Sequence, residues 1–349
     1  MTEPQKPKRR PRYSGKNPRQ FHEKYKEHNP ERYADDVAKI VASGKTPAGT
    51  HRPIMVAEII ETLAPKPGDI AVDATLGYGG HTTELLKAVL PGGRLIAVDA
   101  DPIELPKTEA RLRASGFAED VLTIRRSNFA GLARVLAAEG VAGADVLLAD
   151  LGLSSMQIDD PERGFTFKHG GPLDLRMNPQ RGQSASAFLA GLDVESLAQL
   201  LEANADEPNA TVIARAIVEV QARRRIETTT ELAGIVTNAL SRKPGSPSRD
   251  AAQDAVRRVF QAIRIAVNDE FGALDMLLRQ LPACLKPEGR VAILTFHSGE
   301  DRRVKQAFKD GERSGIYARI ATEVIRPGPE ELRANPRSTP AKLRWAVRA

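Results

Sequence analysis

Glycines follow an apolar run of this chain in a pattern typical of a cofactor loop. Residues 73–82, DATLGYGGHT, contain Gly77, Gly79 and Gly80 and lead into a helix-like segment. Glycines permit a tight turn close to a ligand, and the amides at a helix N-terminus can bind a phosphate or a carboxylate. A dinucleotide fingerprint needs a third glycine where the chain has Thr82. This weakens the NAD interpretation, whereas S-adenosyl-L-methionine offers a carboxylate and no phosphate; a tight turn without a ligand is the other alternative.

Acidic residues end the second and fourth strand-like runs. Asp99 lies 22 residues after Gly77, where a carboxylate can accept hydrogen bonds from the ribose hydroxyls of an adenosine cofactor. We expect Asp101 to cap the next helix rather than to contact a ligand. Asp150 ends DVLLAD at the sheet edge where α/β proteins bind ligands, and it could orient an amine acceptor or a cofactor.

The cysteine content restricts the chemistry. The chain has one cysteine, Cys284, which we expect in the core. Methylation of a pyrimidine at carbon 5 commonly uses a thiolate, whereas an exocyclic amine can attack a methyl sulfonium directly. The sequence therefore favours transfer to nitrogen or oxygen. One cysteine also excludes an intrachain disulfide and a multi-cysteine zinc site, which fits a reducing cytoplasm, and we expect no metal.

A loop with aromatic and basic side chains follows, RGFTFKHGGPLDLRM at 163–177. Aromatic faces can stack unpaired bases while basic groups hold phosphates, as single-stranded RNA recognition requires. A loop packed by its own aromatic residues is an equally weighted alternative. Later, His297 follows a strand-like run and could be a base or a hydrogen-bonded structural histidine. The candidate substrate-binding residues are Arg163, Phe165, Phe167, Asp174, Arg176 and His297.

The elements that must position these residues alternate along the chain. Apolar runs at 69–75, 93–101, 121–127 and 145–152 read as buried strands, with helix-like segments between them. This alternation predicts an α/β fold with a parallel sheet that is covered on both faces. After about residue 154 the sequence shows helix-like periodicity up to a predicted linker at 241–250. One long amphipathic helix is expected over 254–285, followed by a strand.

The predicted domain division has four parts. Residues 1–49 form a basic extension expected to be disordered, 50–153 and 248–349 the two parts of the sheet domain, and 154–247 an inserted helical domain. Residues 1–32 carry 10 Lys and Arg against 4 Glu, which equals the net charge of +6 for the whole chain. Such an arm suits phosphate backbones, and a solubilising role is the alternative. No apolar run reaches roughly 18 residues, so we expect a cytoplasmic protein without a membrane partner; a homodimer is left open.

Several of these segments together resemble the MraW family. They include HRPIMVAEI, DATLGYGGHT, the long DLGLSSMQIDDPERGFTFKHGGPLDLRMNPQRGQSA, FQAIRIAVNDEF and the terminal NPRSTPAKLRWAVRA. The resemblance runs from about residue 50 to the C-terminus. It implies a Rossmann-like class I S-adenosylmethionine-dependent methyltransferase sheet with an inserted α-helical domain, and methylation of N4 of a cytosine in the decoding region (P site) of 16S rRNA in the small ribosomal subunit.

The resemblance also implies which residues bind the cofactor and substrate. The cofactor contacts fall on Gly79, Gly80, His81, Asp99, Phe129, Asp150 and Gln157. The chain departs from the family pattern around Pro208 and in lacking a His-Pro pair before FQA. For catalysis, the hypothesis is that Asp150, or a main-chain carbonyl beside it, accepts a hydrogen bond from the amine of an unstacked cytosine. Ser154 and Ser155 would fix the base edge.

Three other functions are weighed against this hypothesis. The first is a methyltransferase that acts on DNA or protein amines. DNA amino-methyltransferases usually carry Pro-Pro-aromatic after the fourth-strand acid, where this chain has Leu-Gly-Leu. An RNA-binding assembly factor could keep the cofactor pocket without turnover, and an NAD oxidoreductase is the third alternative.

Overall fold

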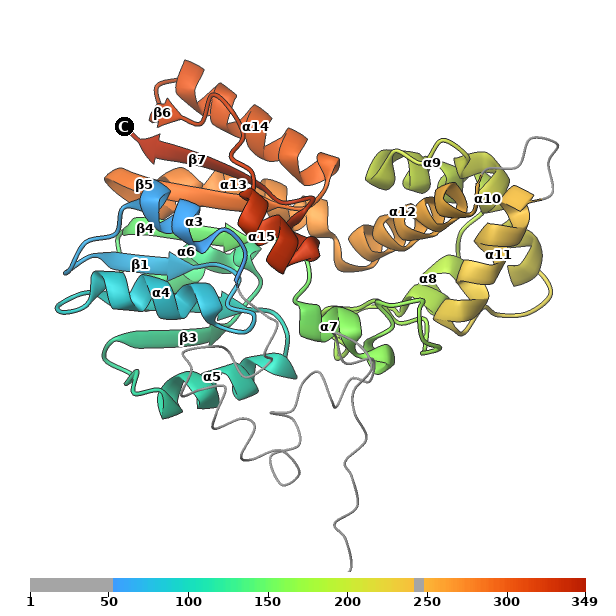
Figure 1. Ribbon diagram of the computed structural model, residues 1–349, viewed down its shortest axis with the longest axis horizontal. Helices are drawn as coiled ribbons and strands as arrows, with labels where there is room; N and C mark the ends of the chain where they lie inside the picture. The colour runs from blue at the N-terminus through green and yellow to red at the C-terminus, as the bar shows by residue number, and fades with distance from the viewer. Residues whose placement is uncertain (1–52, 242–247) are drawn as a thin grey trace, which may run out of the picture. The chain divides into compact units, whose positions relative to one another are not determined.

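The computed structural model describes residues 53–241 and 248–349. The expected basic extension at 1–49 and the central part of the expected linker lie outside the described residues. Within these ranges, strands form one seven-stranded sheet in the order β3-β2-β1-β4-β5-β7-β6 (Figure 1). The strands are β1 (Ile70–Asp73), β2 (Arg94–Asp99), β3 (Leu122–Arg126), β4 (Ala144–Asp150), β5 (Leu285–Thr295), β6 (Tyr317–Ile320) and β7 (Lys342–Arg348).

The first five strands are parallel, and β7 pairs antiparallel with both β5 and β6. Parallel strands need crossover helices on the sheet faces, so continuous apolar runs such as LLA in β4 are buried from both sides. Leu147 and Ala149 pack into one hydrophobic cluster, whereas Val146 and Leu148 pack into the opposite one. The α/β prediction with both faces covered is thereby confirmed.

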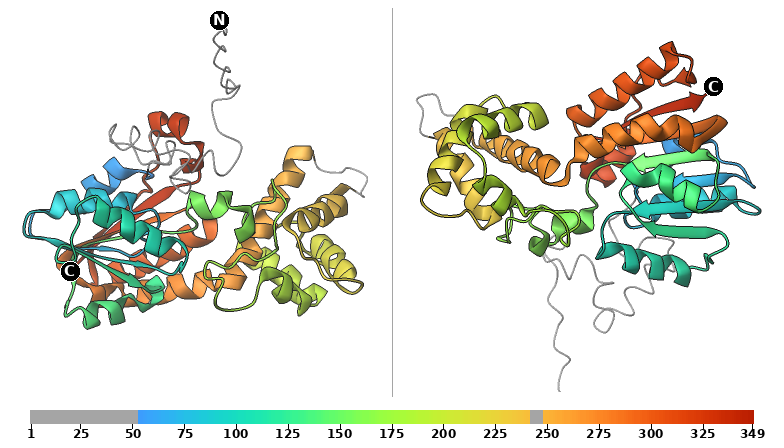
Figure 2. Two further views of the ribbon diagram at one scale, coloured as in Figure 1. Left: turned by 90° about the horizontal axis from the view of Figure 1, so that it is seen from below. Right: turned by 180° about the vertical axis from the view of Figure 1, so that it is seen from behind.

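Helices cover the two faces of the sheet (Figure 2). Helices α3 (Val56–Leu63), α4 (Gly80–Val89) and α5 (Glu104–Ala114) pack on one face. On the other lie α6 (Leu132–Ala138), α13 (Glu270–Cys284) and α14 (Ser298–Arg313). Cys284 is fully buried at the end of α13, as expected, and burial raises the pKa of its thiol to about 11.

A set of helices lies between β4 and β5 in the chain. It comprises α7 (Ser155–Asp159), α8 (Ala185–Ala190), α9 (Val194–Ala205), α10 (Ala210–Gln221), α11 (Thr229–Ser241) and α12 (Arg249–Asn268). Its hydrophobic cluster includes Val259 and Ile263 of α12 as well as side chains of α8 to α11. On packing grounds we therefore place the end of the insertion after Asn268 rather than at residue 247. Pro208 lies between α9 and α10, where it breaks neither helix.

The prediction of a single long helix over 254–285 is wrong. The chain forms α12 and α13 instead, separated by Asp269 in a left-handed conformation with φ 49°. The amide of Asp269 donates to the carbonyl of Ala266 at 3.3 Å, and the amide of Ala273 donates to the carbonyl of Asp269 at 2.9 Å. The apolar periodicity continues through both helices, so the pattern alone could not reveal a break at one residue.

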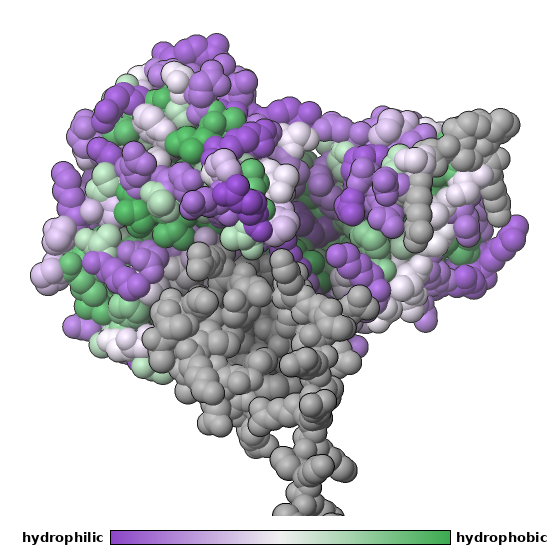
Figure 3. All heavy atoms as spheres, in the orientation of Figure 1, coloured by the Kyte–Doolittle hydropathy of each residue, from purple (hydrophilic) through white to green (hydrophobic). Residues whose placement is uncertain are grey.

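The remaining short helix, α15 (Pro329–Ala334), lies between β6 and β7. Hydrophilic side chains cover much of the visible surface where α14 lies, at the top of Figure 3, while Val304 and Phe308 of this helix are buried. Within the described part of the chain, no helix combines the length and apolarity needed to cross a membrane.

Candidate active site

The glycine loop connects β1 to α4 at the carboxyl edge of the sheet. Gly79 precedes α4 with φ 78°, a left-handed conformation that glycine adopts without strain. A Cβ on Gly79 would come within 3.0 Å of Leu112 on α5, and one on Gly80 within 2.8 Å of Pro53. Packing of the loop against α5 and Pro53 therefore favours glycine at these two positions. Their contact with a cofactor stays a prediction.

Asp73 and Thr82 form a buried pair beneath this loop that the sequence did not reveal. The Thr82 hydroxyl, at the position where a dinucleotide fingerprint would have glycine, donates to Asp73 Oδ2 at 2.6 Å. Burial raises the pKa of Asp73, and the hydrogen bonds from Thr82 and Thr75 oppose that rise. Thr75 also accepts the amide N–H of Asp150 at 2.6 Å, so the ends of β1 and β4 are held together.

Asp99 ends β2 beside the glycine loop. Its Oδ2 accepts the amide of Gly77 and its Oδ1 accepts the amide of Asp101, both at 2.8 Å. Burial raises the pKa of Asp99 to about 6, against the lowering effect of these two backbone bonds. The carboxylate is thus fixed in orientation at the position where ribose binding is predicted.

Asp101 lies two residues before the N-cap of α5 and accepts the amides of Ile103 and Glu104, so it supports the start of that helix without being its N-cap residue. Its second oxygen accepts bonds from Gln157 Nε2 at 2.7 Å and from Arg163 Nη1 at 2.8 Å. All three of these side chains are buried. Asp101 therefore connects the end of β2 to the segment that follows β4.

This network corrects the expectation for Arg163. The residue is 6% exposed, pairs with Asp101 and donates to the carbonyl of Met177 at 2.8 Å. A buried guanidinium that is bonded to Asp101 and to loop carbonyls is not positioned to hold an RNA phosphate, so we interpret Arg163 as an anchor of the 163–177 loop. Gln157, expected to contact the cofactor, bonds to Asp101 and accepts the amide of Ser154.

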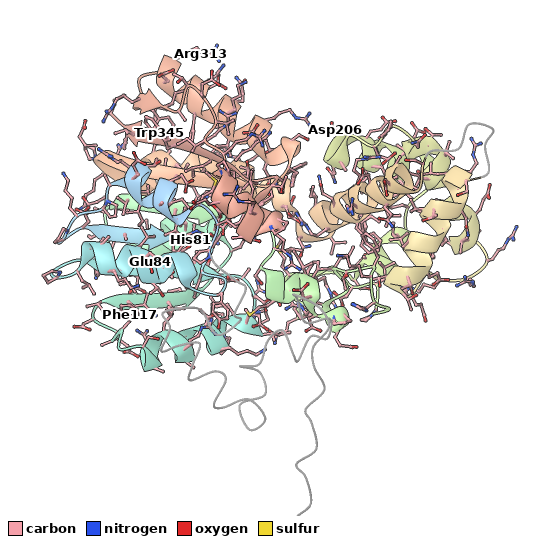
Figure 4. The ribbon with its side chains drawn as sticks, viewed as in Figure 1. His81, Glu84, Phe117, Asp206, Arg313 and Trp345 are labelled. Carbon is pink, nitrogen blue, oxygen red and sulfur yellow. The ribbon has the colours of Figure 1, made fainter. Side chains whose placement is uncertain are left out.

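His81 and Asp150 face each other across the edge of the sheet. His81 lies at the start of α4, one turn before Glu84 (Figure 4). Its Nδ1 is 3.5 Å from Asp150 Oδ2, and its Nε2 is 2.9 Å from the carbonyl oxygen of Ile54. The other oxygen of Asp150, Oδ1, is buried and has no hydrogen-bond partner among the described residues. Burial raises the pKa of Asp150 to about 6, although His81 lowers it.

Three further candidates lie near this edge. Ser154 caps α7 by accepting the amide of Gln157 at 3.2 Å, in a reciprocal capping box. Ser155 begins α7, and its side chain lies outside what the structure describes. Phe129 begins a short turn after β3 and is partly buried against the core of the sheet. A base or adenine contact by any of the three stays a prediction.

The aromatic residues of the 163–177 loop pack inward. Phe165 is 9% exposed in the core of the insertion, and Phe167 packs on Phe260 of α12 with ring centroids 5.3 Å apart. Phe165 thus packs into the core of the insertion, which is nearer to the packed-loop alternative, and base stacking by the half-buried Phe167 stays a prediction. Asp174 and Arg176 form a two-bond ion pair, at 2.8 and 2.7 Å, on the wall of a cavity of about 310 Å³.

His297 serves a structural role at the start of α14. Its Nδ1 accepts the amide of Glu300 at 3.4 Å, and its Nε2 is 3.3 Å from Glu300 Oε1. The bond to Nδ1 favours the structural alternative, whereas Nε2 is buried without a hydrogen-bond partner among the described residues, so a role as a base stays a prediction. Burial raises the pKa of Glu300, but His297, the amide of Phe296 and Arg264 outweigh it, and the pKa is lowered.

Glu270, His297 and Glu300 each bring one ligand-type atom within 4.8 Å of the others. Arg264 already bonds to both oxygens of Glu270, at 2.7 and 2.8 Å. A cation would have to displace this guanidinium, so we interpret the cluster as a charge-paired network that joins α12, α13 and α14.

Comparisons with known proteins agree with this architecture. A family model described as the MraW methylase family matches residues 48–349. "Ribosomal RNA small subunit methyltransferase H 2" of Alkaliphilus metalliredigens is 50% identical over 346 residues, 99% of this chain and 99% of that protein. "Ribosomal RNA small subunit methyltransferase H 1" of Lachnoclostridium phytofermentans is 49% identical over 351 residues, 100% of this chain and 95% of that protein.

Proposed function

Because this chain belongs to the MraW methylase family, we propose that it transfers a methyl group from S-adenosyl-L-methionine to N4 of a cytosine in the decoding region of 16S rRNA. The relatives named as methyltransferases of small-subunit rRNA support the class of substrate. A substrate within the small ribosomal subunit implies that the protein works in the cytoplasm.

The geometry at the ends of β1 and β2 supports the choice of cofactor. An amino-acid carboxylate would meet the glycine loop and the amides that begin α4, while Asp99 would accept the ribose hydroxyls. When bound, S-adenosyl-L-methionine supplies the electrophilic methyl group. Phe129, after β3, is the proposed neighbour of the adenine. The backbone bonds to Asp99 keep its carboxylate oriented, which lowers the entropic cost of binding.

The observation that carries the proposed reaction is the unpartnered Oδ1 of Asp150. A buried carboxylate oxygen without a donor costs free energy, and an amine N–H of the acceptor base would satisfy it. Oδ1 of Asp150 would accept the surplus proton that N4 carries once it has taken the methyl group from the sulfonium. Positioning of the base by this hydrogen bond would supply much of the acceleration. Ser154 and Ser155 are proposed to hold the base edge.

The test is transfer of labelled methyl groups to small subunits that lack the modification, followed by mapping of the labelled nucleoside. We expect label on a cytosine N4 and about a 100-fold or larger loss of turnover in Asp150→Asn. Asp145→Asn is the matched control, because Asp145 begins the same strand at the opposite edge and bonds to Lys286. Label on another atom would overturn the substrate assignment.

An RNA-binding assembly factor is the second candidate, since the ion-paired cavity at Asp174 and Arg176 offers polar groups away from Asp150. Cofactor binding without any methyl transfer to competent subunits would favour it. Equal loss of transfer in Asp150→Asn and Asp145→Asn would instead show that Asp150 has no specific role.

A further inference from the structure

The hydrogen bonding of His81 fixes one of its ring protons. Nε2 lies 2.9 Å from the carbonyl oxygen of Ile54, and a carbonyl oxygen can only accept. Nε2 therefore carries a hydrogen atom. The charge of the ring then depends only on whether Nδ1 is protonated as well.

The partner of Nδ1 decides that question. Nδ1 lies 3.5 Å from Oδ2 of Asp150. An unprotonated Nδ1 and an ionised carboxylate would present two acceptors to each other, which is repulsive where the side chains of His81 and Asp150 are only 9% and 27% exposed. One proton must therefore lie between the two groups, on the ring or on the carboxyl.

The surrounding carboxylates act on both partners. The His81 ring lowers the pKa of Asp73 in β1 and of Glu331 in α15, against the effect of burial. Burial, Asp73 and Glu300 raise the pKa of Asp150, which works against an ionised carboxylate, and the His81 ring lowers it. An imidazolium is stabilised by nearby carboxylates, whereas a neutral ring gains nothing from them.

We propose that His81 is a positioning residue that holds its second ring proton against Oδ2 of Asp150, so that Asp150 stays ionised and presents Oδ1 to the acceptor amine. This role rests on the proposed function and deepens it. It also separates the two oxygens of one carboxylate: Oδ2 is paired with the ring, and Oδ1 is the acceptor for the N4 proton.

The first test observes the ring directly and needs no activity. Full-length protein with ¹⁵N-labelled histidine is studied by NMR across neutral and mildly acidic pH, and the His81 signals are assigned by their loss in His81→Gln. We expect two protonated ring nitrogens at neutral pH in the native protein and only one in Asp150→Asn at the same pH. A ring with one proton in both proteins would overturn the proposal.

The second test uses two variants that each keep half of the geometry. His81→Gln can still donate to the carbonyl of Ile54 but offers no proton to Asp150, while His81→Asn can donate near the Nδ1 position without titrating. Loss of the positive ring should move the acid limb of the kcat profile to higher pH in His81→Gln. A shift of about one pH unit corresponds to a tenfold loss on that limb. We expect His81→Asn to retain more activity.

The outcomes separate this inference from the proposed function. A uniform loss of kcat in His81→Gln with an unmoved acid limb would mean that His81 only supports the fold. If the ring loses its proton in Asp150→Asn yet that variant transfers methyl normally, the pair is real and the catalytic role of Asp150 is wrong. If Asp150→Asn is inactive and the ring is unchanged, the pairing is wrong while the proposed function stands.

Discussion

The buried ion pair between Asp101 and Arg163 gives the sharpest test of how the loop is anchored. Their side chains are 2% and 7% exposed, and the contact is 2.8 Å. The two partners differ in what they retain when the other is removed. Asp101 would keep three donors, from the amides of Ile103 and Glu104 and from Gln157. Arg163 would keep carbonyl oxygens but no bonded carboxylate, and Asp174 would act on it only without a direct bond.

Asp101→Asn should therefore be the more damaging change. It leaves a buried guanidinium without its carboxylate, a loss of about 3–5 kcal/mol in the free energy of unfolding. Arg163→Met leaves a carboxylate that is still hydrogen-bonded, so the loss should be about 1.5–3 kcal/mol, the value of one charged hydrogen bond. The double variant should be no less stable than Asp101→Asn, because the uncompensated charge has gone.

Unfolding of each variant by heat and by urea measures these differences. For a chain of this size each kcal/mol lowers Tm by about 1–2 °C, so the two single variants should be separated by about 2–3 °C. Asp120→Asn is the control, since Asp120 is exposed and should change stability by less than about 0.5 kcal/mol. If Arg163→Met proves as destabilising as Asp101→Asn, the argument from residual partners is refuted.

Three further predictions follow from single sites. Gly164→Ala should destabilise by several kcal/mol more than Gly182→Ala: their φ angles are 74° and 71°, but only at Gly164 would a Cβ meet the Pro172 carbonyl oxygen, at 2.3 Å. A similar Tm for the two variants contradicts this. Cofactor affinity, measured by calorimetry, should fall about tenfold per pH unit below pH 6, because ribose hydroxyls bind the ionised form of Asp99, whose pKa is about 6. Asp99→Asn should bind the cofactor weakly and show no such pH dependence. An unchanged pH dependence in this variant would exclude Asp99 as its source. Phe167→Leu should keep RNA affinity in filter binding, whereas a stacking role would lose about 1–3 kcal/mol.

The sign of the Asp99 titration is opposite for folding and for binding. Its folded pKa lies above the unfolded value of 3.8, so this group stabilises the free protein most at low pH, and that contribution is lost as pH rises through about 6. Hydrogen bonds from the ligand to the ionised carboxylate offset the free-energy cost of burying that charge. Free-protein stability and cofactor affinity should therefore respond to Asp99 in opposite directions between pH 4 and 7, roughly the range between the two pKa values.

The strands of the sheet could be predicted because parallel strands buried on both faces are continuous apolar runs. Strands β1 to β4 fall within the predicted ranges or one residue outside them. Side-chain roles that depend on distant partners could not be predicted. Arg163 looked like an RNA contact because its neighbours are aromatic and basic, and only the fold brings Asp101, 62 residues earlier, within 2.8 Å. The left-handed Asp269 was missed for the complementary reason, since a break at one residue leaves the apolar periodicity unchanged.

Asp73, Asp99 and Asp150 all end strands at one sheet edge, and their partners distinguish them. Asp73 receives a short bond from Thr82, and each oxygen of Asp99 receives a backbone amide. Asp150 alone of these three has a buried oxygen without a donor among the described residues. An acid that is already fully bonded can orient a loop, but it has less capacity to receive a proton. The sequence placed Asp99 and Asp150 at this edge, and only the hydrogen bonds of the three acids identify Asp150 as the one that is incomplete without a ligand.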